Sequence, residues 1–175
     1  MPKKEINLEP VTHITVDAIG KPGERTFYLQ GIKGSQTVHL LIEKVQLQTL
    51  VAGAEQFLQE IAERYPQLKI PEGSYSEDEM RISPPVEPEF RVGDIGLAFD
   101  LERDLVCIIS KEISLDLKEE KEMSIARFWC TRSQLSAIAK WGNAVAARGR
   151  PICPQCLQPM EAEGHFCPKK NGRKR

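Results

Sequence analysis

The chain has 175 residues, of which 41% are hydrophobic and 28% are charged. This balance is typical of a soluble globular protein with one domain of ordinary size and a small appendage. No apolar run approaches the roughly 20 residues that a membrane helix needs. The N-terminal segment, Met-Pro-Lys-Lys-Glu-Ile-Asn, lacks the apolar centre of a signal peptide. We therefore expect a reducing, cytoplasmic location and no membrane partner.

The net charge of −1 conceals an asymmetry between the two ends of the chain. Residues 148–175 carry seven basic and two acidic side chains, so this tail has a charge of +5 and the remainder has −6. A basic tail permits a phosphate-bearing partner such as a nucleic acid. We prefer the simpler interpretation of a solvated end that keeps the chain soluble. The possible phosphate contacts are Lys169, Lys170, Arg173, Lys174 and Arg175.

Residues 11–65 are predicted to form three strands followed by a helix. The expected strands cover residues 11–19, 25–32 and 36–43. Pro22 and Gly23 provide turn chemistry between the first two strands, which suggests a hairpin. Apolar residues then recur every three or four positions from Leu47 to Tyr65, and this spacing predicts one apolar face of a helix that ends at Pro66.

Residues 66–89 contain five prolines and an acidic run, and they predict a long irregular loop outside the sheet core. Residues 90–148 then return to strand-like patterns, with expected strands at 90–100, 105–109 and 123–130. A second helix is predicted from about Arg132 to Ala147. Thr131 and Gln134 match a capping box at its start.

The two halves of the chain resemble each other. When residues 38–47 are set over residues 126–135, Gln46 and Leu47 fall on Gln134 and Leu135, and the apolar positions of both helices coincide. We therefore predict an α+β fold: a mainly antiparallel sheet built from two β-β-β-α-like repeats, with two helices on one face. The repeats span about 11–65 and 90–148, within a body of residues 1–148.

Residues 149–175 are expected to form a separate zinc-binding tail. Two residues separate Cys153 from Cys156 in a Cys-Pro-Gln-Cys turn, and His165 and Cys167 follow a loop. Thiolates and an imidazole suit tetrahedral Zn²⁺, and four protein ligands indicate a structural metal. The segment is too short and too polar to fold without it. The short gap between His165 and Cys167 leaves Glu163 or water as the alternative fourth ligand.

The remaining candidates for chemistry lie in the predicted sheet. Cys107 and Cys130 are interpreted as small buried hydrophobic residues, because no histidine is near either in sequence to act as a base. Polar and aromatic residues on the sheet face opposite the core form a possible ligand face. The alternative is an ordinary half-exposed sheet face. The residues of this face are Tyr28, Gln30, His39, Arg127 and Trp129.

Three stretches of the chain, residues 20–30, 90–100 and 149–172, resemble an uncharacterised bacterial family, catalogued as domain of unknown function 3090. The resemblance spans nearly the whole chain, and its most specific part is the Gly-His-x-Cys-Pro motif at 164–168. It implies one whole-chain unit with a C-terminal metal site, and it brings no established activity. The family usually has glycine directly after the second cysteine, where this chain has Leu157. A zinc knuckle often needs a positive φ at that position.

The preferred function is that of a zinc-stabilised, non-enzymatic binding or adaptor protein with a protein or small-molecule partner. Its support is the closed metal site. One alternative is an enzyme with a small-molecule site on the sheet face around His39 and Arg127. The other is nucleic-acid binding through the basic zinc tail.

Overall fold

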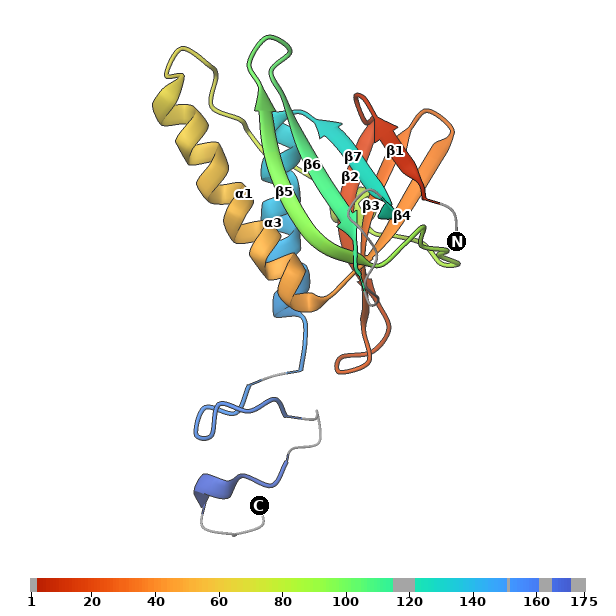
Figure 1. Ribbon diagram of the computed structural model, residues 1–175. Coiled ribbons are helices and arrows are strands. Elements are labelled where there is room, and N and C mark those ends of the chain that lie inside the picture. The colour runs from red at the N-terminus through yellow and green to blue at the C-terminus, as the bar shows by residue number, and fades with distance from the viewer. Residues whose placement is uncertain (1–2, 115–121, 151, 161–164, 171–175) are drawn as a thin grey trace.

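The computed structural model describes residues 3–114, 122–150, 152–160 and 165–170. Within these ranges the chain is an α+β protein with seven strands in two sheets and three α-helices (Figure 1). In chain order the elements are β1 (Glu5–Leu8), β2 (His13–Ile19), β3 (Thr26–Lys33), β4 (Gln36–Ile42), α1 (Lys44–Arg64), α2 (Glu77–Met80), β5 (Val92–Asp100), β6 (Leu105–Glu112), β7 (Ile125–Cys130), α3 (Arg132–Ala147) and the 3-10 turn η2 (Pro168–Lys170).

The expected duplication is present as two strand-strand-strand-helix units, β2-β3-β4-α1 and β5-β6-β7-α3. Each helix follows its third strand almost directly, and each begins with a capping box. The N–H of Glu43 donates to Gln46 Oε1 at 2.7 Å, and the N–H of Thr131 donates to Gln134 Oε1 at 2.9 Å. The glutamine shared by the two repeats therefore has one structural role in both, which is to close the first turn of the helix.

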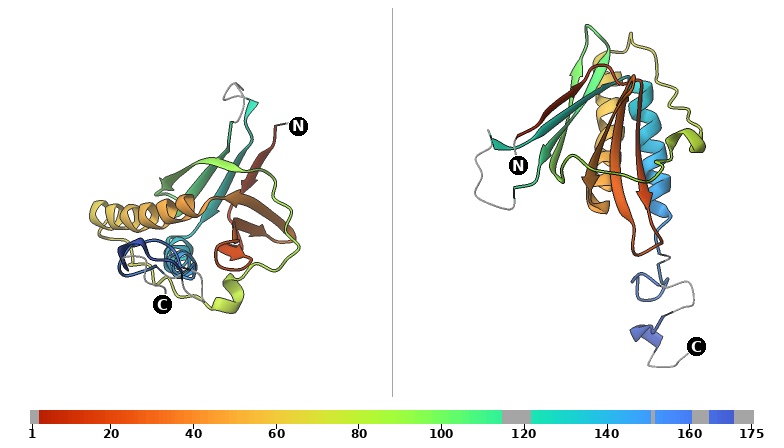
Figure 2. Two further views of the ribbon diagram at one scale, coloured as in Figure 1. Left: turned by 90° about the horizontal axis from the view of Figure 1, so that it is seen from below. Right: turned by 90° about the vertical axis from the view of Figure 1, so that its right-hand side faces the viewer.

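The strands form two sheets, with orders β2-β3-β4 and β1-β7-β6-β5. All pairings are antiparallel except that of β1 with β7. Backbone hydrogen bonds also link the two sheets, among them those from Leu41 N–H to Phe90 O at 3.0 Å and from Val11 N–H to Trp129 O at 2.8 Å. The strands consequently wrap around one side of a helix pair rather than forming one flat layer (Figure 2).

The core lies between the strands and the two long helices, α1 and α3. Gly142 allows these helices to pack closely, because a Cβ there would lie 2.8 Å from Val51 Cγ2. Trp141 is fully buried, and its indole N–H donates to Val16 O at 2.6 Å. Phe128 on β7 is also fully buried, so each repeat contributes large side chains to one common core.

The segment from 66 to 89 lies outside both sheets, but it packs on the body more tightly than the sequence predicts. Met80 and Ile82 are buried. Thr15 Oγ1 donates to Met80 O at 2.6 Å, and Asp17 Oδ2 accepts the N–H of Ile82 at 2.8 Å. The predicted loop therefore lies outside the sheets, but side chains of β2 hold its second half against the body.

No helix in the described part of the chain is both long enough and apolar enough to cross a membrane.

Candidate metal centre

The first pair of candidate ligands lies in a tight turn beyond the end of α3 (Figure 1). Leu157 N–H donates to Cys153 O at 2.9 Å, and Cys153 N–H donates to Gln158 O at 2.9 Å. Ile152 and Pro159 form an antiparallel bridge that closes the base of the turn. This small hairpin holds Cys153 and Cys156 on one side, which is the arrangement that a metal-binding knuckle requires.

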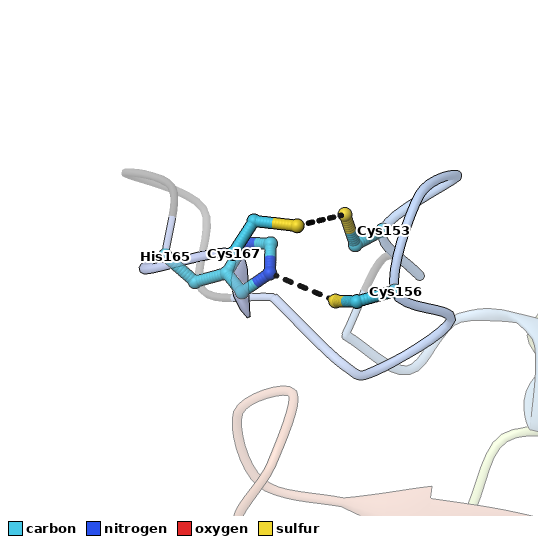
Figure 3. Close-up of side chains that lie close together, drawn as sticks. All are labelled: Cys153, Cys156, His165 and Cys167. Atoms are coloured by element: carbon cyan, nitrogen blue, oxygen red, sulfur yellow. Dashed lines mark hydrogen bonds between the residues drawn. The ribbon is translucent and has the colours of Figure 1, made fainter. Parts of the chain in front are cut away.

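The second pair, His165 and Cys167, faces the first (Figure 3). The four ligand atoms all lie within 4.8 Å of one another. Cys153 Sγ is 3.9 Å from Cys167 Sγ, and Cys156 Sγ is 3.3 Å from His165 Nε2. Zn–S bonds of about 2.3 Å and a Zn–N bond of about 2.0 Å at tetrahedral angles would place two sulfurs about 3.8 Å apart and sulfur and nitrogen about 3.5 Å apart. Two of the spacings are therefore close to those of a tetrahedral site, and the cluster could hold a metal ion.

The backbone of the turn also favours the thiolate form of one ligand, Cys153. Hydrogen bonds from the backbone of Cys156 and Gln155 lower the pKa of Cys153 to about 7. At Cys156, a hydrogen bond from the backbone of Gln158 acts in the same direction, but burial and the neighbouring thiols outweigh it and raise the pKa. All the cysteines of the structure are free, and Cys153 and Cys167 are buried. The cluster can hold a metal ion once its thiols lose their protons.

Comparison with family models gives one match that spans both the body and the metal cluster. The model of the protein family of unknown function DUF3090 matches residues 6–167. The chain belongs to the DUF3090 family. The matched segment ends at Cys167, so it contains all four ligands of the cluster. No curated protein and no solved structure matches the chain.

Leu157, which directly follows Cys156, has a φ of 61°. The expected positive φ is therefore confirmed, although the residue is not glycine. A left-handed conformation costs an L-residue with a Cβ about 1 kcal/mol. The side chain is 69% exposed, so packing offsets little of this cost. The knuckle consequently carries backbone strain that a glycine would remove.

Several predicted site residues fall outside what the structure describes. These are Glu163, which was the alternative fourth ligand, and Arg173, Lys174 and Arg175 of the basic tail. Lys169 is exposed, and Lys170 belongs to η2. His165 presents Nε2 to the cluster, which makes it a geometrically suitable fourth ligand.

The five residues of the possible ligand face belong to two different sheets. Tyr28, Gln30 and His39 lie on β3 and β4, whereas Arg127 and Trp129 lie on β7. Gln30 and His39 are direct cross-strand partners, with His39 Nε2 3.0 Å from Gln30 Oε1. Burial lowers the pKa of His39, and the carboxylate of Glu89 opposes this shift. This favours a neutral imidazole at physiological pH.

On the other sheet, Trp129 already has partners within the protein. Its indole N–H donates to Asn7 Oδ1 at 3.1 Å, and the guanidinium of Arg103 lies 4.4 Å from the ring centroid. These contacts fit a half-exposed sheet face that the neighbouring elements cover in part. They link Trp129 to β1 and to the β5–β6 turn rather than to His39.

Cys107 and Cys130 are buried, as the sequence predicts. Burial raises the pKa of Cys107 to about 11 and that of Cys130 to about 12. Both side chains are therefore thiols rather than thiolates at neutral pH. A thiol is a weak nucleophile, so this chemistry supports a packing role.

Sequence reasoning missed a groove of about 470 Å³ between α1 and β5. Its lining includes Gly53 from the helix and Gly96 from the strand. Gly53 and Gly96 are 43 residues apart in the sequence, and no local pattern predicts that their segments face each other. The one available signal was the presence of glycine inside a helix and inside a strand.

Proposed function

We propose that the chain is a zinc-stabilised, non-enzymatic binding or adaptor protein. The observation that carries this proposal is the cluster of three cysteines and one histidine, whose ligand atoms lie within 4.8 Å of one another. Four protein ligands fill a tetrahedral coordination sphere and leave no position for a reacting water. A zinc ion held in this way stabilises structure, so the functional role falls to the surfaces that it organises.

The donor set supports zinc as the metal. Three thiolates and an imidazole form a soft set that suits Zn²⁺, whereas Mg²⁺ and Ca²⁺ prefer oxygen ligands. The tail also has little else to hold it together, because Ile152, Leu157 and Phe166 are exposed. Metal binding would supply the free energy of folding for this segment, on the order of 10 kcal/mol at neutral pH.

A reducing, cytoplasmic setting is consistent with this proposal. The cysteines of the structure are free thiols, and an oxidising compartment would favour disulfides over metal ligation. The partner of the adaptor is a protein or a small molecule, and nucleic-acid binding through the tail is the less favoured alternative.

Metal analysis of the purified full-length protein tests the proposal. We expect one zinc per chain by elemental analysis, and a matching mass increase by native mass spectrometry. Cys153→Ser should lower the zinc content several-fold, whereas Cys107→Ser in the body should keep it at one. Protein purified without chelator and found free of zinc would contradict the proposal.

A further inference from the structure

The groove between α1 and β5 lies along the open edge of a sheet. β5 is the last strand in the order β1-β7-β6-β5, so β6 pairs with only one of its two edges. The other edge faces α1, next to which β5 lies (Figure 1). In an edge strand, alternate residues direct their N–H and C=O groups away from the sheet, where another extended chain can pair with them.

The position beside β5 is one that β4 begins to occupy and then leaves. Leu41 of β4 forms a parallel bridge with Arg91, immediately before β5. β4 then ends at Ile42, and the chain turns into α1. Had β4 continued straight, it would have paired with the outer edge of β5. The groove is therefore a vacant strand position that has a helix as its outer wall.

Gln46 shows how the backbone of this edge is satisfied at one end. Its side-chain Nε2 donates to Val92 O at 2.9 Å and to Gly93 O at 3.0 Å. Among the described residues, no other side chain donates a hydrogen bond to β5 on this edge. The side-chain amide of Gln46 thus donates where the backbone N–H of a neighbouring strand would otherwise donate. The edge from Asp94 to Leu97 can receive a further chain in the same way.

Two glycines widen the groove without any structural need for glycine. A Cβ on Gly53 or on Gly96 would meet no atom within 4 Å, and neither residue has a positive φ. In contrast, Gly142 and Gly93 are required by close neighbours at 2.8 and 2.9 Å. Glycine inside a helix costs about 1 kcal/mol relative to alanine, and glycine in a strand often marks the close approach of another backbone. Both facts are explained if a second chain lies in the groove.

The side chains of the groove define the chemistry of that chain. Leu50, Phe57 and Leu97 offer apolar contacts along the walls, and the charged members of the lining are Glu60 and Asp94. The lining contains no lysine, arginine or histidine. Lys111 stands opposite Asp94 on β6, outside the lining. The groove therefore complements an extended segment that carries both apolar and cationic side chains.

We propose that this groove binds an extended peptide segment of a partner protein, which adds to β5 as a further strand. The segment has apolar side chains alternating with lysine or arginine, because successive side chains of a strand point to opposite sides. Its apolar side chains pack against the groove walls, and its cationic side chains lie near Glu60 and Asp94. The inference rests on the binding role proposed above and names the class of partner.

Selection from a display library of short random peptides tests this inference on the zinc-loaded, full-length protein. The selected peptides are then synthesised in two forms, one unmodified and one with alternate backbone amides N-methylated. We expect enrichment of sequences that alternate apolar and basic residues, and at least about tenfold weaker binding of the methylated form, because it cannot complete the ladder. In NMR spectra of the protein, the unmodified peptide should change the amide chemical shifts of residues 94–97.

Filling the groove provides the matched variants. Gly53→Leu places a side chain into open space on the helix wall of the groove, so it should melt at or above the temperature of the wild-type protein and lose at least about tenfold in affinity. Ala62→Leu, at an exposed position of α1 outside the groove, is the control and should bind as the wild type does. Glu60→Gln combined with Asp94→Asn should weaken the basic peptides selectively.

Three results would overturn the inference. They are equal binding by the methylated peptide, equal binding by the filled-groove variant, and failure of the library to yield any groove-dependent peptide. Loss of a wild-type dimer in Gly53→Leu would also overturn it and would assign the groove to a second copy of the chain. The zinc measurement does not depend on this selection, so the inference and the proposed function can fail separately.

Discussion

The body and the tail of this protein are held together in opposite ways. In the body, large apolar side chains such as Phe128 and Trp141 are fully buried. In the tail the thiols are inside, with Cys153 and Cys167 only 3% and 5% exposed, while Phe166 is 65% exposed. Burial of apolar surface stabilises the first region, and metal ligation would stabilise the second. The stabilities of the body and of the tail should therefore respond to different perturbations.

Removal of the metal should produce the largest effect. We expect Cys153→Ser, or treatment of the wild type with a strong chelator, to disorder the chain beyond about residue 149, because the site would supply on the order of 10 kcal/mol to a segment without a core. Hydrogen exchange of the tail amides should become fast, while protection in β6 and α3 remains. Cys107→Ser serves as the control and should leave exchange in the tail unchanged. Unfolding of the whole chain by Cys153→Ser would show that the tail is part of the body.

A cavity in the apolar core should destabilise the body and leave the metal site of the tail intact. Phe128→Ala removes a fully buried ring between the sheets and should lower the free energy of unfolding by about 3–5 kcal/mol. Zinc content measured below the new melting temperature should stay at one per chain. Loss of zinc in the folded variant would mean that the body positions the ligands.

The loop contact of β2 provides a smaller test within the body. Asp17→Ala removes the acceptor of the Ile82 N–H, which lies at a buried position. We expect a loss of about 1–3 kcal/mol in urea unfolding, which is the usual cost of a buried donor without a partner. Asp78→Ala, at an exposed position of α2, is the control and should change stability by less than about 0.5 kcal/mol. An unchanged midpoint for Asp17→Ala would show that this contact does not hold the loop on the body.

Relief of the backbone strain at Leu157 should increase the affinity for zinc. Leu157→Gly removes the Cβ at a φ of 61° and should tighten zinc binding about fivefold, which corresponds to about 1 kcal/mol. A competition titration with a chromophoric chelator measures this. Leu157→Ala keeps the Cβ and should show little gain, so it separates backbone strain from loss of the exposed leucine.

The smallest expected effect concerns nucleic acid. The tail charge of +5 is opposed by −6 on the rest of the chain, so we expect only weak binding of duplex DNA at physiological salt. Five phosphate contacts would give a log–log salt slope of about −4.5 on duplex DNA and about −3.5 on a single strand. An anisotropy titration at low salt measures this. Tight binding that disappears on removal of residues 169–175 would make the tail the functional element.

Local patterns predicted most elements of the fold. The second helix was expected at 132–147 and occupies those residues, because a capping box and an apolar stripe are both local signals. β1 was not predicted. It is four residues long, and its partner, β7, lies about 120 positions later in the chain. The separation of the strands into two sheets depends on twist and packing, which no short window of sequence contains.

The candidate metal site was more predictable than the groove. Its four ligands fall within 15 residues, so spacing alone suggested that they meet. Even the positive φ at Leu157 followed from the comparison with the family pattern. The groove instead combines α1 with β5, and its form depends on where β4 stops pairing. Such features are properties of the assembled chain.

The junction glutamines tie the two halves of the body to each other. Gln46 donates to Val92 O, at the start of the second half, and Gln134 Nε2 lies 3.5 Å from Thr12 O, at the start of the first. Each half therefore donates a side-chain hydrogen bond to the backbone at the start of the other half. Two copies of one half-length chain would make such reciprocal contacts in a symmetric dimer. The body has the construction of such a dimer fused into a single polypeptide. Cutting it between the halves would leave each with polar groups that only the other half satisfies.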